Sequence, residues 1–320
     1  MRTNGIEYTA QGQTAFCDLG TPPKPAATEV LIRTEFSGIT NGTERHALMG
    51  EHVWKGNFPS RHGYQHVGVI DAVGEAVTDF TVGQRVFFGH YVGHRAWNVI
   101  DVADAGGSHL TMPIPDDMDP RHAALLGVAG VAMRGVRRMR MGVGMNVWCL
   151  GGGPIGQFAA QSARAAGARV TVSEIDDKRL AVAKELGAHR VLDARKDDLF
   201  DKLKEAGQYN AIIDTSGIPS LLPDIFAHNL LAHAGVMGLI AVRSDVTFPW
   251  SMMHSTEASI EVSCHFSLDD LRVLIDLIER EVINVEPLIT HTVPIDDAVG
   301  IYDTIRDDPR ALLGVVFDWR

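Results

Sequence analysis

A glycine-rich turn between a short apolar run and an amphipathic segment limits the possible fold more than any other feature of this sequence. Residues 151–156 read Gly-Gly-Gly-Pro-Ile-Gly and satisfy the spacing G-x-G-x-x-G. The pattern follows an expected strand at Asn146–Leu150 and opens an expected helix at Ile155–Ala166, whose apolar side chains repeat at helical spacing. This order of strand, glycine turn and helix predicts the start of a parallel sheet that binds a dinucleotide.

Each residue of the turn has a separate expected role. Gly151 permits the tight turn, Gly153 lets the backbone approach a pyrophosphate, and Gly156 lets the helix pack closely on the strand. Pro154 and Ile155 begin the helix, whose unpaired N–H groups and partial positive charge favour a phosphate. The sequence therefore predicts that these five residues bind the pyrophosphate of a dinucleotide cofactor.

An acidic residue at the end of the next expected strand makes the cofactor prediction more specific. Glu174 lies 18 residues beyond Gly156, where a carboxylate accepts hydrogen bonds from both ribose hydroxyls. The same charge repels a 2′-phosphate, which favours NAD over NADP. Arg179 is also within reach of the adenosine side and keeps NADP as an alternative. The remaining residues expected to bind the cofactor are Ser216 and Leu239.

The hydrophobic pattern divides the chain into two domains. Residues 26–103 contain short apolar runs punctuated by glycine, which predict a largely antiparallel, barrel-like domain. From residue 146 onward, short strands alternate with helical segments, which predicts a parallel sheet with right-handed crossovers. A helix is expected at Ser267–Glu281, and Leu313–Phe317 reads as a strand that rejoins the first domain. The strands expected in the parallel sheet are Asn146–Leu150, Arg169–Glu174, Arg190–Asp193, Asn210–Thr215 and Gly235–Ala241.

Composition excludes several classes of partner. The net charge of −11 repels nucleic-acid backbones and anionic membrane surfaces, so we expect neither as a partner. No apolar run reaches the length of a membrane span and no signal-peptide core follows the first residues, so we expect a cytoplasmic protein that binds a small-molecule substrate. The three cysteines are too dispersed for a disulfide framework or a CxxC cluster.

Five further stretches carry a family resemblance: Ser37–Glu44, Gly63–Gly68, Gly83–Val86, Leu180–Ala188 and Pro287–His291. With them, nearly the whole chain resembles the medium-chain dehydrogenase/reductase superfamily. The resemblance implies an α/β fold, in which a Rossmann doubly wound parallel sheet (residues 125–265) is inserted in a discontinuous GroES-like β-barrel domain (residues 1–124 plus 266–320). It also implies a homodimer that pairs Rossmann sheets edge to edge, through the strand at residues 235–242.

Within that superfamily, the Gly-Ile-x-x-Gly-Thr-Glu variant at residues 38–44 and the Gly-Tyr at residues 63–64 resemble the 2-desacetyl-2-hydroxyethyl bacteriochlorophyllide a dehydrogenase branch. That branch oxidises a hydroxyethyl side chain to acetyl. Gln65 departs from the Gly-Tyr-Glu of the branch, and the glycine turn here is fuller. The resemblance is therefore to the branch and does not extend to the substrate.

The residues that bind catalytic zinc in the zinc alcohol dehydrogenases of the superfamily have no counterparts here. Thr40 or Asn41 replaces the cysteine, Tyr64 the histidine and Gln65 the glutamate. The third-ligand region, residues 126–130, reads Leu-Gly-Val-Ala-Gly and offers no sulfur, imidazole or carboxylate. Because a catalytic zinc site needs about three such ligands, the resemblance implies an enzyme without a metal. A different metal site is a weaker alternative, built from His62, His66, His90, His94 and His109.

Without zinc, side chains must remove the hydroxyl proton of an alcohol. Zinc-holding relatives relay that proton through a hydroxyl and then an imidazole, and the matching positions here are Thr43 and His46. Tyr64 is placed to donate its hydroxyl to the substrate oxygen, although a tyrosine there could equally fill vacated space and His46 could be an ordinary surface histidine. A basic cluster at Arg134, Arg137, Arg138 and Arg140 reads as a solvated helix face, or as a contact for an anionic substrate or the cofactor phosphates.

We expect a zinc-independent, NAD(H)-dependent oxidoreductase that interconverts a secondary alcohol and a ketone by hydride transfer. Two alternatives remain. One is a quinone or enone reductase that uses NAD(P)H, and the other is a non-catalytic NAD-binding regulatory protein. Glu174 counts against the first because such reductases usually prefer NADPH, and Thr43 with His46 counts against the second.

Overall fold

The computed structural model describes residues 2–103, 110–248 and 250–320, and these form two compact units. The first unit contains residues 1–127, 267–271 and 289–320, and the second contains residues 128–266 and 272–288. Two helices contribute to both units: α3 (Leu126–Arg138) and α9 (Leu268–Glu279). Among the described residues, no helix is both long and apolar enough to span a bilayer.

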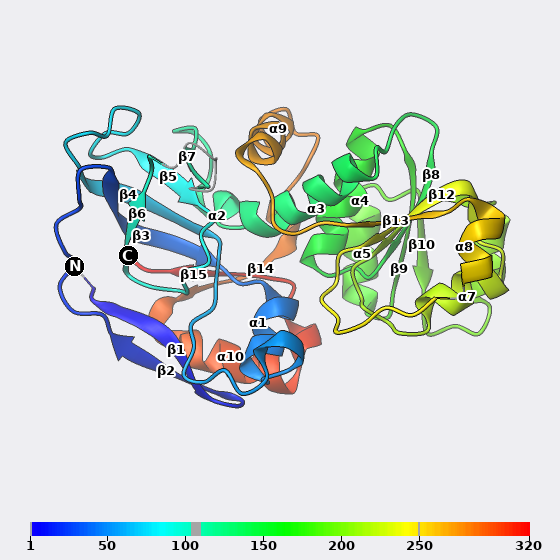
Figure 1. The fold of residues 1–320 in the computed structure, drawn as a ribbon, viewed down its shortest axis with the longest axis horizontal. Coiled ribbons are helices and arrows are strands. Elements are labelled where there is room, and N and C mark those ends of the chain that lie inside the picture. The colour runs from blue at the N-terminus through cyan, green and yellow to red at the C-terminus, as the bar shows by residue number, and fades with distance from the viewer. Residues whose placement is uncertain (1, 104–109, 249) are drawn as a thin grey trace. The chain divides into compact units, whose positions relative to one another are not determined.

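The first unit is built on a seven-stranded sheet in which most neighbours are antiparallel. The strands follow the order β14-β15-β3-β4-β5-β7, and β6 pairs with β3 outside this path. Strand β15 lies beside β3 although the two are far apart in sequence, as the red and blue segments of Figure 1 show. The strands are β1 (Asn4–Ala10), β2 (Gln13–Asp18), β3 (Glu29–Gly38), β4 (His66–Val73), β5 (Arg85–Phe88), β6 (Trp97–Asp101), β7 (Thr111–Pro113), β14 (Ile289–Pro294) and β15 (Gly314–Asp318), and the helices are α1 (Asn41–Leu48), α2 (Pro120–Ala123) and α10 (Ala298–Asp307).

The core of the first unit explains why the strands lack a simple alternation of apolar and polar residues. Nearly every residue of β3 is buried, since one face packs on a cluster around Val30, Ile32 and Phe88. The other face meets a larger cluster that includes Leu31 and Tyr302. Strand β3 is therefore covered on both faces by apolar clusters.

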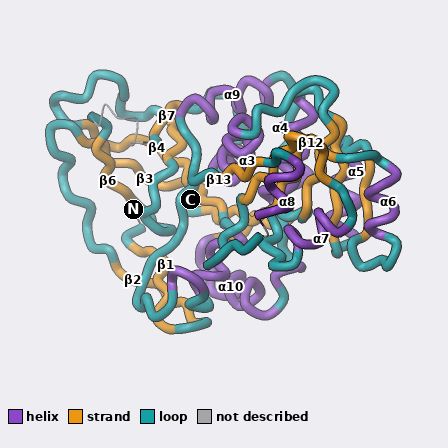
Figure 2. Tube along the Cα trace, turned by 45° about the vertical axis from the view of Figure 1, so that its right-hand side comes forward, coloured by secondary structure: helices purple, strands orange, loops and turns teal. Residues whose placement is uncertain are grey.

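The second unit is a six-stranded parallel sheet with helices among its strands. The strand order is β10-β9-β8-β11-β12-β13, and every recorded pair in it is parallel. Figure 2 shows these strands in orange among purple helices such as α4, α5 and α7. The elements are β8 (Asn146–Leu150), α4 (Pro154–Ala165), β9 (Arg169–Glu174), α5 (Asp177–Glu185), β10 (Arg190–Asp193), α6 (Leu199–Glu205), β11 (Tyr209–Asp214), α7 (Leu221–Ala227), β12 (Leu231–Leu239), α8 (Trp250–Thr256) and β13 (Ser259–Val262).

The predicted fold class is confirmed: a Rossmann-type parallel sheet is inserted in a GroES-like barrel. Strands β8, β9 and β10 have the predicted bounds. Strand β12 begins at Leu231 instead of Gly235, and its first residues include Ala234 with a φ of 55°. A strand whose first residues include a left-handed residue and a glycine does not show the sequence pattern of a strand.

Two expectations differ from the structure. The strand expected to form a dimer edge, β12, is paired with β11 on one side and β13 on the other, so the edge strand at this end of the sheet is β13. Residues 272–288 group with the Rossmann unit, whereas the resemblance implies that all of residues 266–320 belong to the barrel domain. The amide of Gln161 on α4 explains this grouping, because it bonds both the N–H and the carbonyl of Asn284, at 2.8 and 3.1 Å.

Candidate active site

The glycine turn joins β8 to α4 in the geometry that its sequence predicts. Gly151 follows β8 with a φ of 99°, a left-handed conformation that glycine adopts at little cost. Gly153 caps α4 in an extended conformation, with φ −67° and ψ 178°, and Pro154 occupies the first helical turn. Ile155 and Gly156 follow in the same turn. The free N–H groups at this helix end can bind an anion.

Space around the turn differs sharply between its glycines. A Cβ added to Gly156 would lie 1.9 Å from the carbonyl oxygen of Gly151, so helix and strand already touch there. The Thr215 hydroxyl tightens this contact by donating to the Leu150 carbonyl at 2.9 Å. A Cβ added to Gly153 meets nothing within 4 Å, which leaves room for a ligand beside the backbone. The close packing expected at Gly156 is present, and the approach of a pyrophosphate to Gly153 stays a prediction.

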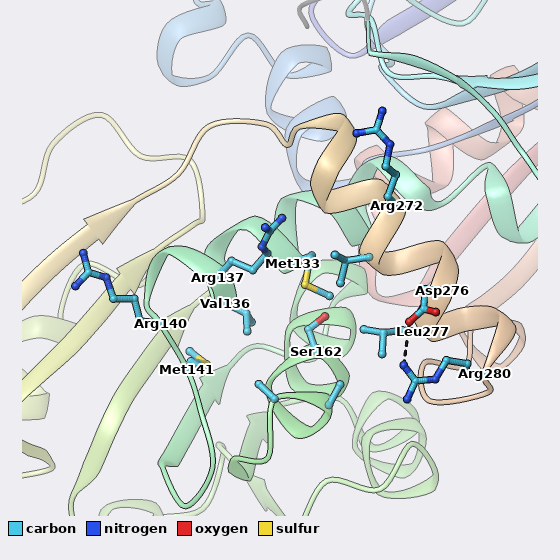
Figure 3. A pocket seen from close by; sticks show the side chains of 13 residues that line it. Met133, Val136, Arg137, Arg140, Met141, Ser162, Arg272, Asp276, Leu277 and Arg280 are labelled. Carbon is cyan, nitrogen blue, oxygen red and sulfur yellow. Dashed lines mark hydrogen bonds and ion pairs between the residues drawn. The ribbon is translucent and has the colours of Figure 1, made fainter.

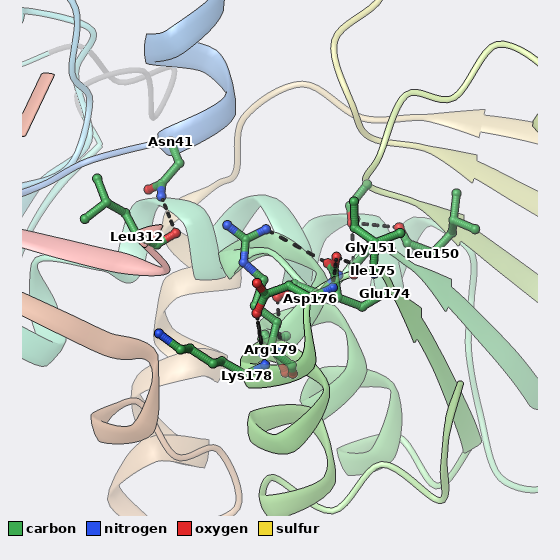
Figure 4. A network of polar contacts seen from close by, with 12 residues as sticks. Asn41, Leu150, Gly151, Glu174, Ile175, Asp176, Lys178, Arg179 and Leu312 are labelled. Carbon is green, nitrogen blue, oxygen red and sulfur yellow. Dashed lines mark hydrogen bonds and ion pairs between the residues drawn. The ribbon is translucent and has the colours of Figure 1, made fainter. Parts of the chain in front are cut away.

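Glu174 lies at the end of β9 and its carboxylate is held by the backbone (Figure 4). One oxygen accepts the Gly152 N–H at 2.6 Å, and the other accepts the N–H groups of Ile175 at 2.6 Å and Asp176 at 3.1 Å. The guanidinium of Arg179 stands 4.0 Å from the first oxygen. A carboxylate has about four lone-pair positions, so three N–H donors leave capacity for a further hydroxyl.

Other residues at this edge of the sheet follow neighbouring strands. Ser216 comes just after β11, and both its N–H and its hydroxyl donate to one Asp214 oxygen at 2.8 Å. Leu239 ends β12 and is buried. Because parallel strands present their carboxyl ends at the same edge, Gly151, Glu174 and these residues share the edge where such sheets bind ligands.

Sequence reasoning missed two polar groups of this unit. The buried Asp214 carboxylate accepts the N–H groups of the loop after β11 with one oxygen and pairs with Arg243, which follows β12, at 2.6 Å with the other. The buried Gln157 amide donates to the carbonyls of Gly152 at 3.1 Å and Arg179 at 2.9 Å, which ties the turn to α5. The only sequence signal was the position of Gln157 in the first turn of a helix that opens on a glycine motif.

The three residues predicted to move protons all lie in the first unit. Thr43 and His46 are three residues apart on α1, a spacing that places them on one face of the helix. His46 Nδ1 lies 2.6 Å from Glu51, and Arg45 also approaches that oxygen, at 3.3 Å. Burial opposes ionisation of Glu51, yet the hydrogen bond from His46 and the charge of Arg45 hold the pKa of its carboxyl below the usual value.

Tyr64 lies apart from α1 in sequence and is placed just before β4. Its ring is buried and stacks on Tyr91, with ring centres 5.8 Å apart and planes 16° from parallel. Tyr64 also contacts the backbone at Gly127, where an added Cβ would lie 3.0 Å from its ring. The phenol therefore sits against the segment that supplies the third zinc ligand in zinc-holding relatives.

The positions that correspond to zinc ligands lie close together, but their donors do not suit zinc. A Cβ on Gly127 would lie 2.7 Å from the Cβ of Gln65, and Gln65 and Tyr64 are adjacent and buried. Thr40 is buried, and its hydroxyl has no hydrogen-bond partner among the described residues. A hydroxyl, a phenol, an amide and a glycine do not replace the thiolates, imidazoles and carboxylates that hold zinc. The donor set does not fit the metal.

Next to these residues lies a buried carboxylate that the sequence analysis did not single out. Glu44 on α1 accepts the Thr40 N–H at 2.7 Å with one oxygen. Its other oxygen is bonded by Tyr302 at 2.6 Å, His94 at 3.1 Å and Tyr8 at 3.3 Å. Burial raises the pKa of Glu44, but His94 and these donors outweigh it and keep the pKa below the ordinary value.

Neighbouring groups determine which ring nitrogen of His94 faces Glu44 as a donor. The indole N–H of Trp319 donates to the Ser37 hydroxyl oxygen at 2.9 Å. That leaves the hydroxyl hydrogen of Ser37 to donate to His94 Nδ1, 2.8 Å away. The remaining nitrogen, Nε2, then carries the hydrogen that bonds Glu44.

The other histidines considered for a metal site have different partners. His62 bonds Ser60 and Tyr91, His66 lies 3.1 Å from the Gly93 carbonyl, and His94 bonds Glu44. His90 has its own contacts, and His109 lies outside the described residues.

Comparison with known families finds a matching family for each of the two units. Residues 26–113 match the family described as alcohol dehydrogenase GroES-like domain, and residues 154–280 match the family described as zinc-binding dehydrogenase. The chain belongs to the medium-chain dehydrogenase/reductase superfamily. Members of this superfamily among its relatives are named dehydrogenases, and the chain is an oxidoreductase of the alcohol dehydrogenase-like type.

Individual members of the superfamily match over almost their full length. L-threonine 3-dehydrogenase of Alteromonas mediterranea is 27% identical over 330 residues, which cover 93% of this chain and 95% of that protein. The structure of 2R,3R-butanediol dehydrogenase from Bacillus subtilis superposes with a TM-score of 0.85 at 18% identity, with 99% of each chain covered. A protein described as a short chain alcohol dehydrogenase from Escherichia coli CFT073, complexed with cofactor NADH, gives a TM-score of 0.86 at 23% identity, with the same coverage.

Proposed function

We propose that this chain is a zinc-independent, NAD(H)-dependent dehydrogenase that interconverts a secondary alcohol and a ketone. The observation that carries the proposal is the replacement of the zinc-binding donors by Thr40, Tyr64, Gln65 and Gly127 in a fold that otherwise keeps its dinucleotide turn. Two relatives support the substrate class, since L-threonine 3-dehydrogenase and butanediol dehydrogenase are both named for secondary alcohols.

The cofactor preference is proposed from Glu174. Its carboxylate stands beside the glycine turn and carries a negative charge where a 2′-phosphate would have to bind. Arg179 is 4.0 Å away and reduces that repulsion without removing it. We therefore expect binding of NAD(H) by Gly151, Gly153, Pro154, Ile155, Gly156, Glu174, Arg179, Ser216 and Leu239, with NADP(H) bound more weakly.

Bound nicotinamide supplies the hydride acceptor in alcohol oxidation. The chain's own task is to take the hydroxyl proton as the carbon–hydrogen bond breaks. Tyr64 provides a buried phenol, and Thr43 and His46 provide a hydroxyl and an imidazole on one helix face. With Nδ1 of His46 donating to Glu51, its Nε2 keeps the lone pair that accepts a proton. In the reverse direction the same groups return the proton to the carbonyl oxygen.

A paired absorbance assay tests this function. The protein is incubated with NAD⁺ and secondary alcohols that include L-threonine, 2,3-butanediol and a hydroxyethyl-substituted tetrapyrrole, and NADH is followed at its absorbance band. NADH formation with at least one alcohol is expected. It should persist after chelator treatment, and metal analysis of the same sample checks that the metal has been removed. Activity that disappears with the chelator and returns with zinc would overturn the zinc-independent mechanism.

The same assay separates the alternative functions. Oxidation of NADH or NADPH by enones or quinones, with no alcohol oxidised, would instead indicate a double-bond reductase. Tight NADH binding with no turnover in either direction would indicate a regulatory NAD-binding protein. The assay therefore distinguishes three outcomes: alcohol oxidation that requires zinc, reduction of enones or quinones by NADH or NADPH, and NADH binding without turnover.

We further propose a cytoplasmic homodimer that pairs its sheets through β13. This strand is one of the two edge strands of the parallel sheet, and its Val262 is 62% exposed. Exposed edge strands pair readily with a second chain. Light scattering after gel filtration should give twice the chain mass, and a Val262→Lys chain should be mainly monomeric. A monomeric wild-type protein contradicts this assembly.

A further inference from the structure

A pocket within the second unit lies away from the predicted cofactor turn. It has a volume of about 710 Å³, which is in the range of sites for small organic ligands. Its wall is formed by α3, the segment after it, the later part of α4, and α9 (Figure 3). Ser162 of α4 lies eight residues beyond Pro154, about 12 Å along the helix axis at 1.5 Å per residue. The pocket is therefore separate from the pyrophosphate turn.

The inner surface of this pocket is apolar with one polar exception. Met133, Val136, Met141 and Leu277 contribute most of the apolar atoms, together with small alanines of α4. The exception is Ser162, whose residue is 2% exposed and whose hydroxyl has no hydrogen-bond partner among the described residues. A buried hydroxyl without a partner is uncommon, because it forfeits a hydrogen bond that water would supply.

The rim of the pocket is strongly cationic in a chain that is otherwise acidic. Arg137, Arg140, Arg272 and Arg280 line it, and Asp276, bonded to Arg280 at 2.9 Å, is its one acidic residue. Figure 3 shows the guanidinium groups of Arg137, Arg140 and Arg272 at the outer ends of their side chains, away from Ser162 and Leu277. The rim thus carries a formal charge of +3, while the whole chain carries −11.

The basic cluster of the sequence is divided by this arrangement. Arg137 and Arg140 line the pocket, whereas Arg138 pairs with Glu261 at 2.9 Å. Arginine stems cover apolar surface while their charged ends stay near water, which suits an anion at the rim. An apolar interior below a guanidinium rim is complementary to a molecule with an apolar body and one anionic head.

We propose that this pocket binds a small amphipathic anion, of the class of medium-chain carboxylates. The apolar body lies against Met133, Val136 and Leu277, and the carboxylate is bound by Arg137 and Arg272 at the rim. The binding does not depend on the proposed dehydrogenase activity and does not compete with NAD(H).

Displacement of a fluorescent anion tests the proposal on the full chain. 8-Anilinonaphthalene-1-sulfonate is bound first, in the presence of saturating NADH, and decanoate is then titrated. Decanoate should displace the dye, whereas decyltrimethylammonium and 1-decanol, which lack the anionic head, should displace it at least tenfold less well. A tenfold difference is the loss expected for one hydrogen bond to a charged group.

Three variants locate the binding. Arg137→Gln combined with Arg272→Gln should weaken decanoate binding at least tenfold, because both stems remain and both charges are removed. Arg138→Gln, on the same helix but paired with Glu261, is the matched control and should bind decanoate as the wild type does. Ser162→Leu fills the interior and should abolish decanoate binding. NADH binding, measured on every variant, shows that the second unit is folded.

Two results would overturn the proposal. One is equal displacement by decanoate, the decyl cation and decanol, which would mark an unselective apolar groove. The other is unchanged decanoate affinity in the Arg137/Arg272 variant and in Ser162→Leu while both still bind NADH, which would place the anion elsewhere.

Discussion

Two glycines of the turn should respond in opposite ways to the same substitution. In Gly156→Ala, the new Cβ would stand 1.9 Å from the Gly151 carbonyl oxygen, where a C···O contact is ordinarily about 3.3 Å or more. Backbone, and not a flexible side chain, occupies that space, so α4 or the turn must move by more than about 1 Å. We expect a cost of about 3 kcal/mol, the upper end of common overpacking penalties, and a Tm lower by roughly 6–12 °C.

Gly153→Ala should leave the fold intact and weaken the cofactor. Its Cβ meets nothing within 4 Å, and φ −67° with ψ 178° suits alanine. The entropic gain of alanine in the unfolded chain offsets its poorer helix capping, so stability should change by less than about 0.5 kcal/mol. A methyl where the pyrophosphate approaches should weaken NADH binding about tenfold or more, or about 1.4 kcal/mol.

Circular dichroism melting and NADH fluorescence titration measure the two effects separately. Gly142→Ala is the matched control, since its added Cβ also meets nothing within 4 Å and it lies outside the turn. That variant should keep both the Tm and the NADH affinity. Wild-type NADH affinity in Gly153→Ala would refute the pyrophosphate site at the turn. A wild-type Tm in Gly156→Ala would refute the close contact of helix and strand.

Further predictions concern three other residues. Glu174→Gln removes the charge beside the turn, so the ratio of NADP to NAD affinity should rise about tenfold or more in calorimetric titrations; an unchanged ratio contradicts the cofactor assignment. Tyr64→Phe should lower kcat about 10²-fold with NADH affinity unchanged, whereas a normal kcat would make the ring a space filler. Burial holds the pKa of His66 well below its usual value. As the pH falls, the unfolded chain therefore takes up a proton before the folded chain does. At pH values below about 6.5 the free energy of unfolding should decrease, by up to about 1.4 kcal/mol per pH unit from this group, until the pH reaches the pKa of His66 in the folded chain. Urea midpoints at pH 7.5 and 5.5 check this, and His66→Gln should show a smaller difference between them.

Features that depend on neighbours in sequence could be predicted. The glycine turn, the strand before it and the helix after it lie within residues 146–166, and their geometry follows from local rules of backbone freedom and helix capping. Glu174 at the end of β9 could also be predicted, from its spacing to the glycine turn. Its three backbone N–H donors were not predicted, because they depend on how the turn folds back over the strand.

Features that depend on distant segments could not be predicted. Glu44 has partners at Tyr8, His94 and Tyr302, which span almost the whole chain. No periodicity or motif connects these four residues, and only the folded barrel brings them together. The division of the arginine cluster, with Arg138 turned away to Glu261, likewise depends on tertiary packing.

The pairing of β15 with β3 has a consequence for the order in which the chain folds during synthesis. Val316 pairs with Gly38 and Phe317 with Ser37, so these contacts join segments about 280 residues apart. All six strands of the parallel sheet are made before β15 leaves the ribosome, and that sheet can form while the barrel still lacks a central strand. During that interval the end of β3 at residues 36–38 lacks its partner on one side, and the synthesis of β15 decides when this edge is protected from aggregation.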